Sequence, residues 1–171
     1  MAWLSTQQNQ FVVGYDTGAL AFFDILSASL SSAQTVNTPK INNLVAHPTR
    51  TLVCTGHENG NINVFDYGSD TVVKSIPAAH SDAVSCLGIS NTGLQLLSGG
   101  HDGHLKVWDL RKMDEPDADK QMQATEPLHV VQNAHKMKYD EGVQGLMIHP
   151  TQPFVATGGA DSIIQVFELF A

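Results

Sequence analysis

The sequence predicts an all-β fold made of repeated four-stranded units, a β-propeller. One pattern of 24 residues occurs four times, and we align the copies without a gap at 1–24, 43–66, 86–109 and 145–168. The equivalent residues Phe11, Val53, Leu96 and Val155 are spaced by 42, 43 and 59 positions. A period in the low forties, with short apolar runs between glycine-rich turns, is typical of propeller blades.

Each copy closes on a strand that ends in an aromatic residue and an acid. The four closing segments read FVVGYDTGALAFFD, VCTGHENGNINVFD, LLSGGHDGHLKVWD and VATGGADSIIQVFE. Leu105 and Val107 alternate with the polar residues His104 and Lys106, which is the period of two of a strand. No segment sustains a period of 3.6 residues, so we expect no helix.

The turn residues agree with this reading. Gly18, Gly60 and Gly103 occupy one equivalent position. A tight hairpin needs a positive φ there, which glycine adopts at little cost. Ser162 departs from the pattern in the last copy.

We place four consecutive four-stranded blades at 1–34, 41–77, 83–132 and 143–168. Met1 aligns with positions inside the first strand of the later blades, and the chain stops shortly after the third strand of the last blade. We therefore expect that blade to have no fourth strand of its own and the chain to be part of a larger propeller. The alternatives are four blades that stay open or that oligomerise.

The segment 111–127 (RKMDEPDADKQMQATEP) lengthens blade three. It is polar, acidic and contains proline, so we expect a mobile loop. A calcium loop of the EF-hand type would need glycine at its sixth position and glutamate at its twelfth, and neither is arranged here.

The composition excludes several classes of function. A net charge of −8 with only nine Lys and Arg argues against binding nucleic acid or an anionic membrane. The given sequence contains no apolar run of membrane-spanning length and no charged segment followed by an apolar one, so we expect neither a spanning helix nor a signal peptide within it. Cys54 and Cys86 have no paired spacing, so we interpret them as buried, reduced thiols of a cytosolic protein. Nothing in the sequence indicates a cofactor.

Blade three contains a set of four polar and aromatic residues that resembles a hydrolase triad, namely His80, Ser98, Asp102 and Trp108. A nucleophilic serine stands exposed on a strained turn, whereas Ser98 lies in the middle of a strand. We favour a structural network in which Trp108 donates to Ser98, the serine hydroxyl contacts His80, and His80 donates to Asp102. Hydrolysis remains the less favoured alternative.

Blade four repeats the set in part, with His135, Thr157 and Asp161, but with Phe167 in place of the tryptophan. Blade two has only Thr55 and Asn59, and blade one lacks the set. We expect these three blades to be softer than blade three.

Two local features remain as candidate sites. His101 and His104 could suggest a metal site, but they diverge on a tight turn and lack further ligands, so we favour a role in the turn. The connector 133–142 (NAHKMKYDEG) combines Lys136, Lys138 and the aromatic Tyr139. It is either a partner-binding edge or an ordinary solvated loop.

These residues carry a resemblance. With Ser98, Asp102 and the ending Val107-Trp108-Asp109, blade three resembles a WD repeat. Nearly the whole chain resembles the C-terminal blades of the striatin family, through INNLVAHPTRTLVCTGHENGNINVFD (41–66), AAHSDAVSCLGISNTGLQLLSGGHDGHLKVWDL (78–110) and AHKMKYDEGVQGLMIHPTQPFVATGGADSIIQVF (134–167). The two His-Pro-Thr turns at 47–49 and 149–151 are among its most specific parts.

The resemblance implies the C-terminal part of a seven-bladed WD-repeat propeller and a non-enzymatic, cytoplasmic scaffold. By resemblance, its partners are protein phosphatase 2A, kinases and Mob-family proteins, with membrane association only through upstream regions. Striatin segments that bind phosphatase subunits, caveolin and calmodulin have no counterpart in this chain. A WD-repeat adaptor of another complex is the alternative function.

Overall fold

The computed structural model describes residues 1–7, 9–35, 39–113 and 126–169. These residues form four antiparallel sheets, which follow one another along the chain. The first sheet, blade one, contains β1 (Ala2–Trp3), β2 (Gln10–Gly14), β3 (Ala19–Asp24) and β4 (Ser29–Thr35). Blade two contains β5 (Ile41–Ala46), β6 (Leu52–His57), β7 (Ile62–Asp66) and β8 (Thr71–Ile76).

Blade three contains β9 (Val84–Ile89), β10 (Gln95–Gly100), β11 (Leu105–Asp109) and β12 (His129–Val131). Blade four contains β13 (Val143–Ile148), β14 (Phe154–Gly159) and β15 (Ile164–Glu168). Within the described residues the last sheet therefore has three strands, whereas the other three sheets have four. The expected lack of a fourth strand in that blade agrees with this sheet.

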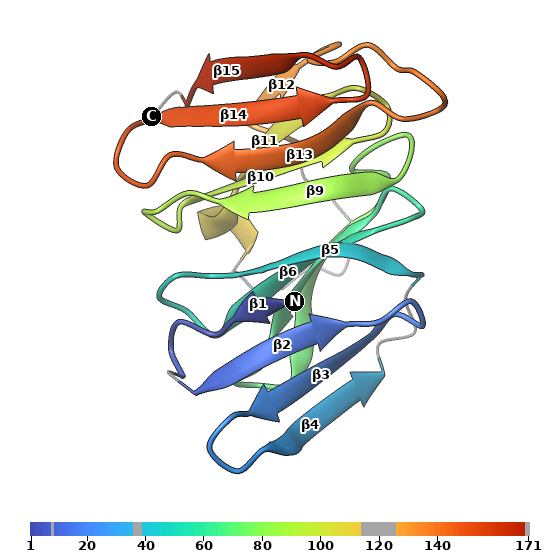
Figure 1. Ribbon diagram of the computed structural model, residues 1–171. Coiled ribbons are helices and arrows are strands. Elements are labelled where there is room, and N and C mark those ends of the chain that lie inside the picture. Colours follow the sequence, from blue (N-terminus) through green and yellow to red (C-terminus); the bar gives the residue numbers. More distant parts are fainter. Residues whose placement is uncertain (8, 36–38, 114–125, 170–171) are drawn as a thin grey trace.

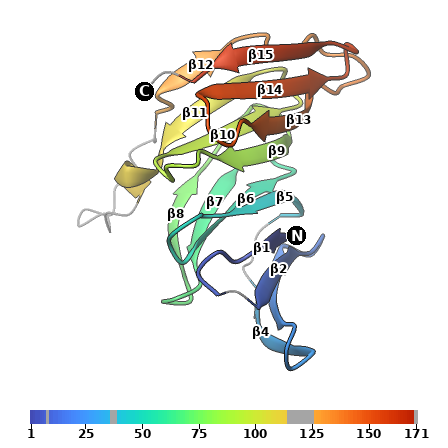
Figure 2. The ribbon, with the colours of Figure 1, turned by 60° about the vertical axis from the view of Figure 1, so that its left-hand side comes forward.

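The sheets are stacked face to face as successive blades (Figures 1 and 2). The first strands of neighbouring blades, such as β5 with β9 and β9 with β13, contact each other. The all-β prediction of a partial propeller is confirmed. The hydrophobic core is divided accordingly into three clusters, one at each contact between adjacent blades.

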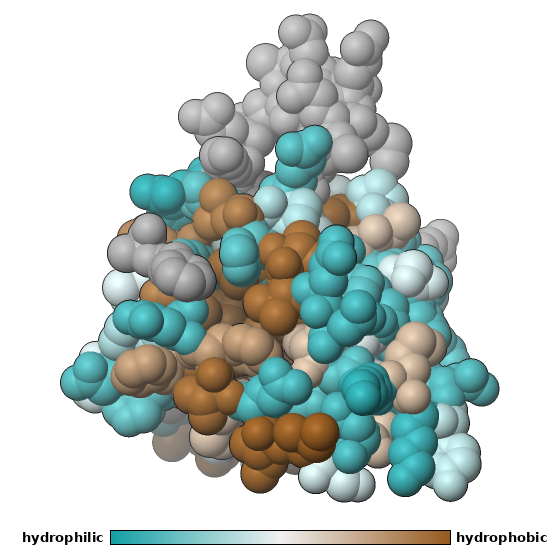
Figure 3. Space-filling model, turned by 90° about the horizontal axis from the view of Figure 1, so that it is seen from above, coloured by the Kyte–Doolittle hydropathy of each residue, from teal (hydrophilic) through white to brown (hydrophobic). Residues whose placement is uncertain are grey.

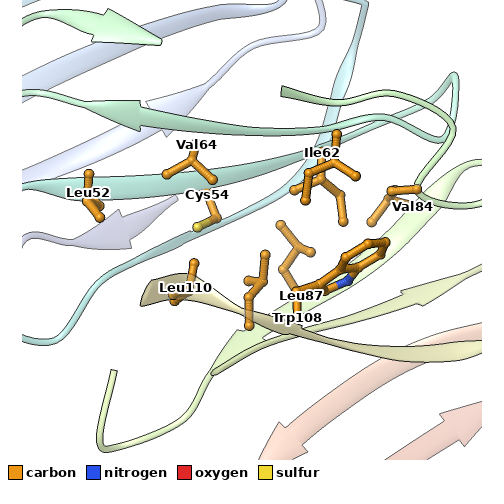
Figure 4. Close-up of a cluster of buried hydrophobic side chains, with 11 residues drawn as sticks. Leu52, Cys54, Ile62, Val64, Val84, Leu87, Trp108 and Leu110 are labelled. Atoms are coloured by element: carbon orange, nitrogen blue, oxygen red, sulfur yellow. The ribbon is translucent and has the colours of Figure 1, made fainter. Parts of the chain in front are cut away.

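The cluster between blades two and three shows how the strand period builds these contacts (Figure 4). Ile62 and Val64 point from β7 toward blade three, where Leu87 and Trp108 cover them. Phe65, the next residue along β7, packs in the opposite direction against blade one. Because alternate side chains face opposite sides of a strand, each inner blade is apolar on both faces.

The turn predictions are confirmed. Gly18, Gly60 and Gly103 have φ values of 78°, 79° and 78°, and Ser162 takes the equivalent conformation with φ 65°. A side chain at Gly60 would also collide with the backbone oxygen of His80. Ser162 thus has a positive φ at the last turn, a backbone conformation that costs serine more free energy than it costs glycine.

The gapless alignment of the four copies is wrong in blade one. Trp3 pairs with Phe11, whereas in blade two the equivalent partner of Val53 is Ala46. The segment between the paired residues is thus one residue longer in blade one. Trp3, and not Leu4 as aligned, occupies the place of Ala46.

One short helical element also departs from the sequence analysis. Leu110–Met113 form a single turn of 3₁₀ helix, η1, where we expected no helix. The Asp109 carboxylate accepts the backbone N–H of Arg111, and Leu110 is buried in the cluster between blades two and three. Most of the expected mobile loop, residues 114–125, lies outside the described residues.

Candidate functional site

The four polar and aromatic residues singled out in blade three form one continuous chain of hydrogen bonds. The indole Nε1–H of Trp108 donates to Ser98 Oγ over 2.9 Å. The Ser98 hydroxyl lies 2.7 Å from His80 Nε2, and His80 Nδ1 lies 2.9 Å from Asp102 Oδ1. Because Nδ1 donates to the carboxylate, Nε2 accepts the serine proton.

Asp102 is the anion of this network. Burial by itself raises its pKa, but hydrogen bonds from His80 and from the N–H groups of His104 and Ser81 together outweigh burial and bring the pKa to about 2. The carboxylate is therefore charged at neutral pH and fully engaged. It fixes the His80 ring and, through the backbone N–H of His104, the turn that precedes β11.

The geometry of the network favours a structural role. Ser98 is 0% exposed and lies within β10, paired on both sides by β9 and β11. A nucleophile in this position cannot meet a substrate, and acyl transfer also requires oxyanion donors around an open pocket. The geometry thus argues against the hydrolase alternative.

Blade four contains the partial set. His135 Nδ1 lies 3.0 Å from Asp161 Oδ1, and His135 Nε2 lies 2.9 Å from Thr157 Oγ1. Burial raises the pKa of Asp161, but hydrogen bonds from His135 and from the backbone of Lys136 and Ile163 lower it overall. Phe167 supplies no donor, so this chain stops at the threonine.

Blade two contains a network that sequence reasoning missed. His57, at the end of β6, places Nε2 at 2.9 Å from Thr55 Oγ1 and at 3.1 Å from Asn63 Nδ2. Its Nδ1 donates to the carbonyl of Pro39 over 2.9 Å. The expectation of Thr55 and Asn59 alone is wrong, because Asn59 only accepts the Asn61 N–H within its own turn. The sequence did contain a signal for this network, because the polar residues Thr55 and His57 alternate along a buried strand.

The histidines of these networks also join consecutive blades. The backbone N–H of His80 donates to Gly60 O in blade two over 3.0 Å, while its ring belongs to blade three. His135 N donates to Gly103 O in the same way over 3.1 Å. Each of these histidines lies in a connector and therefore links a turn of the preceding blade to the polar network of the following blade.

His47, in the first His-Pro-Thr turn, makes a second kind of contact between blades. Its Nδ1 accepts the N–H groups of Thr49 and Arg50, so its Nε2–H donates to Gly93 O of blade three over 2.9 Å. Burial lowers the pKa of His47. The neutral ring is required because both turn amides need an unprotonated Nδ1.

The connector between blades three and four places its aromatic residue at an exposed tip. Lys138 and Glu141 exchange both backbone hydrogen bonds around Tyr139 and Asp140. Both central residues have positive φ, 55° and 61°, as in a type I′ turn. Tyr139 is 87% exposed, and the Lys138 ammonium lies 5.4 Å from its ring centroid.

A polar hollow of about 510 Å³ lies on the same rim. It spans blades two to four, and its lining includes Glu58, Asp82, His101 and Glu141. Glu141 therefore belongs both to the turn that presents Tyr139 and to this hollow. Lys136 anchors the start of the connector through its backbone N–H, which donates to Asp161 Oδ2.

The remaining candidate residues, His101 and His104, take part in hydrogen bonds around their turn. His104 Nδ1 accepts the N–H of Asn133, and the backbone N–H of His101 donates to Ala83 O. Among the described residues, no group of three or more histidine, cysteine or acidic side chains is arranged to hold a metal ion. Cys54 and Cys86 are free and buried, and burial raises both thiol pKa values, that of Cys54 to about 12. No helix in the described part of the chain could span a membrane.

The stacked antiparallel blades and their histidine networks are consistent with part of a WD-repeat propeller, and sequence comparison agrees. The family described as WD domain, G-beta repeat matches residues 71–109 and 126–168. Each match combines the outer strand of one blade with the three strands of the next, β8 with β9–β11 and β12 with β13–β15. The chain therefore contains WD repeats.

The chain is also similar to striatins over nearly its whole length. It is 31% identical to the striatin homolog of Dictyostelium discoideum over 95% of this chain and 19% of that protein. It is 29% identical to striatin-4 of Mus musculus over 98% of this chain and 21% of that protein. The chain thus spans about a fifth of the length of these relatives. The WD repeats and this similarity support a protein-interaction scaffold.

Proposed function

We propose that this chain is a non-enzymatic scaffold that binds protein partners through the rim formed by its blade connectors. The observation that carries the proposal is the exposed Tyr139 at the tip of a two-residue turn with positive φ. Non-glycine residues in such conformations cost on the order of 1–3 kcal/mol each and are concentrated at functional sites.

The chemistry of the tip suits partner binding. A tyrosine ring offers a large contact area at low entropic cost, and tyrosine is enriched among the residues that dominate binding energies. Lys136 and Lys138 are two of only nine basic residues in a chain of net charge −8. They would steer an acidic segment of a partner toward the ring.

The finer assignment follows from the similarity to striatins. We propose that the partners belong to an assembly of protein phosphatase 2A, kinases and Mob-family proteins. The buried reduced thiols Cys54 and Cys86 support a cytoplasmic location within this proposal. A WD-repeat adaptor of another complex would use the same rim with different partners.

The test compares the parent chain with the double change Tyr139→Asn and Asp140→Gly. Asn-Gly is the preferred pair for a type I′ turn, so the hairpin is retained and its strain removed. We expect the melting temperature to stay the same or rise, and binding to a purified Mob-family protein or kinase of this assembly, measured by interferometry, to be lost.

Lys136→Ser with Lys138→Ser is the companion variant, and it should weaken binding with a reduced dependence on salt. Unchanged binding in the Asn-Gly variant would show that Tyr139 is part of an ordinary loop. If the parent chain binds none of these proteins, the phosphatase–kinase assignment is wrong, and the scaffold reading then depends on other partners.

A further inference from the structure

Blades two and three are held together by apolar contacts on their faces and by hydrogen bonds at their rims. Figure 3, which looks down on blade four, shows the same division in one blade, with apolar side chains across the face and hydrophilic ones on both sides of them. At the connector rim His80 N donates to Gly60 O. At the opposite rim, where β5 ends, the ring of His47 donates to Gly93 O. The two histidine rings have different partners, so they respond differently to a proton.

The His47 ring can hold only one proton in this structure. Its Nδ1 accepts two backbone N–H groups, from Thr49 over 3.1 Å and from Arg50 over 3.0 Å, and its Nε2 lies 2.9 Å from Gly93 O. The carbonyl oxygen can only accept, so Nε2 carries the proton and Nδ1 carries a lone pair. A second proton, on Nδ1, would point at two N–H donors. The turn would lose both hydrogen bonds, and the ring would become a buried charge.

The surroundings of His47 do not stabilise a positive charge. The residue is 2% exposed, and a Cβ atom on Gly93 would lie 2.5 Å from its ring, so the ring packs directly on the backbone of blade three. Burial lowers the pKa of His47, and the positive charge of Arg50 in the same turn acts in the same direction. The corresponding turns of the adjacent blades, 4–9 and 90–95, contain no charged residue.

The acidic side chains near this rim have other partners. The Asp66 carboxylate, in the turn after β7, accepts the Thr51 hydroxyl. Asp70, later in that turn, is exposed. Asp109 of blade three is paired with Arg111. Within the described residues no carboxylate contacts the His47 ring, so no negative charge is placed to offset a proton on it.

The histidines of the connector rim are different. His80 Nδ1 donates to the Asp102 carboxylate, and its Nε2 faces the Ser98 hydroxyl. A second proton on His80 would lie next to oxygen lone pairs and near a negative charge, because a hydroxyl can accept as well as donate. His135 has a carboxylate and a hydroxyl in the same places. The connector rim therefore tolerates a proton that the opposite rim does not.

Blades three and four are joined in another way at the rim of His47. Ser90 occupies the position of His47 in blade three. The side-chain amide of Asn91 instead donates to the carbonyls of His149 and Pro150. An amide group does not titrate, so the direct contact between blades three and four keeps its donor at acid pH.

We propose that His47 is a proton-sensitive latch between blades two and three. Binding of one proton to Nδ1 releases the amides of Thr49 and Arg50, separates the β5–β6 turn from Gly93 and opens the two blades at that rim. The His80 contact keeps the connector rim closed, so the blades hinge about it. Acid thus opens this one contact at a pH at which the rest of the segment stays folded.

Urea unfolding of the 171-residue chain and of His47→Ser, at pH 7.5 and at pH 5.5, tests the latch. Serine holds the equivalent turn in blade three, where Ser90 Oγ accepts the Gln95 N–H, so the variant keeps a turn that binds no proton. The unfolded chain, with an ordinary histidine pKa of 6.5, takes up the proton first as pH falls, so the contribution of His47 is present above pH 6.5 and is lost below it. At pH 5.5 the unfolding equilibrium constant of the parent should have risen about tenfold more than that of His47→Ser.

His149→Ser is the matched control for this measurement. His149 Nδ1 accepts two turn N–H groups as His47 does, but its side chain is exposed, so water can replace these hydrogen bonds. The control should keep most of the dependence on pH that the parent shows.

Nuclear magnetic resonance on the parent tests the latch without a substitution. The His47 ring should be neutral at pH 7.5, with its proton on Nε2. As the ring titrates, the amides of Thr49 and Arg50 should exchange faster relative to their intrinsic rates, whereas the His80 amide keeps its protection. The proposal is overturned if parent and His47→Ser lose stability equally with acid, or if the His47 ring is already charged at pH 7.5. It is also overturned if the turn amides stay protected after the ring has titrated, or if the His80 amide opens together with them.

Discussion

At the residue scale, buried polar groups in this chain are matched to partners. Among the described residues, no buried side-chain nitrogen or oxygen lacks a hydrogen bond. Ser98 is an example, because its hydroxyl accepts one hydrogen bond from Trp108 and donates another to His80. A buried group left unpaired costs on the order of 1–3 kcal/mol, so each member of the network depends on the others.

Removing a member of the network should therefore destabilise blade three. We expect Trp108→Phe and His80→Ala each to lower stability by roughly 1–3 kcal/mol, because Ser98 or Asp102 loses its buried partner. Thermal melts provide the measurement. Val72→Thr, an exposed change on β8, is the control, and melting temperatures equal to the parent in both network variants would refute this account.

Asp102 should also give the fold a defined sensitivity to acid. Its folded pKa of about 2 lies below the ordinary aspartate pKa of 3.8, so the unfolded chain binds the proton first as pH falls. Its contribution is fully present above pH 3.8 and is lost as pH falls toward 2, on the order of 1–2 kcal/mol.

Denaturant melts of the parent and of Asp102→Asn at pH 2 to 6 measure this effect. Asp102→Asn should be less stable at pH 6 and show a shallower loss of stability over the acidic window. Parallel curves for the two proteins would mean that another carboxylate controls the acid transition.

At the element scale, neighbouring blades approach closely because glycine occupies a fixed position near the end of the second strand. Val84 packs over Gly56, and Val143 packs over Gly99. A Cβ atom added to either glycine would lie 2.6 Å from the nearest atom of that valine. The backbone conformation at these sites is ordinary, so space and not φ requires the glycine.

We therefore expect Gly56→Ala to destabilise the fold by about 1–3 kcal/mol through overpacking against Val84. Gly145→Ala is the matched change, because a Cβ there meets nothing within 4 Å. It should leave stability unchanged or raise it by up to about 1 kcal/mol. Urea unfolding of both variants measures their stability. Equal changes in stability would show that β9 moves away from the added methyl group at position 56.

At the scale of the whole molecule, stability should differ from blade to blade because each blade contacts only its neighbours. Blade three is covered on both faces and contains the complete network. Within the described part of the chain, blade four is covered on one face, and its network stops at Thr157.

Hydrogen exchange followed by mass spectrometry should reveal this gradient. We expect the amides of β10 and β11 to exchange most slowly, and those of β14 and β15 to exchange faster, by at least about tenfold. Uniform exchange across the blades would contradict a stability built from neighbour contacts.

The sequence by itself determined the repeat, the strands, the turn glycines and the network of blade three. These features depend on local spacing and on residue types with few alternative uses, such as a positive φ at Gly60 or a buried His80 that needs both of its partners. The register of Trp3 and the contact of His57 with Pro39 were decided by tertiary structure, because a one-residue difference in a loop and a backbone partner 18 residues away leave no local pattern. The uncovered faces of blades one and four were likewise decided there, since Ile164 and Ile62 are equivalent in sequence and differ only in whether another sheet lies against them.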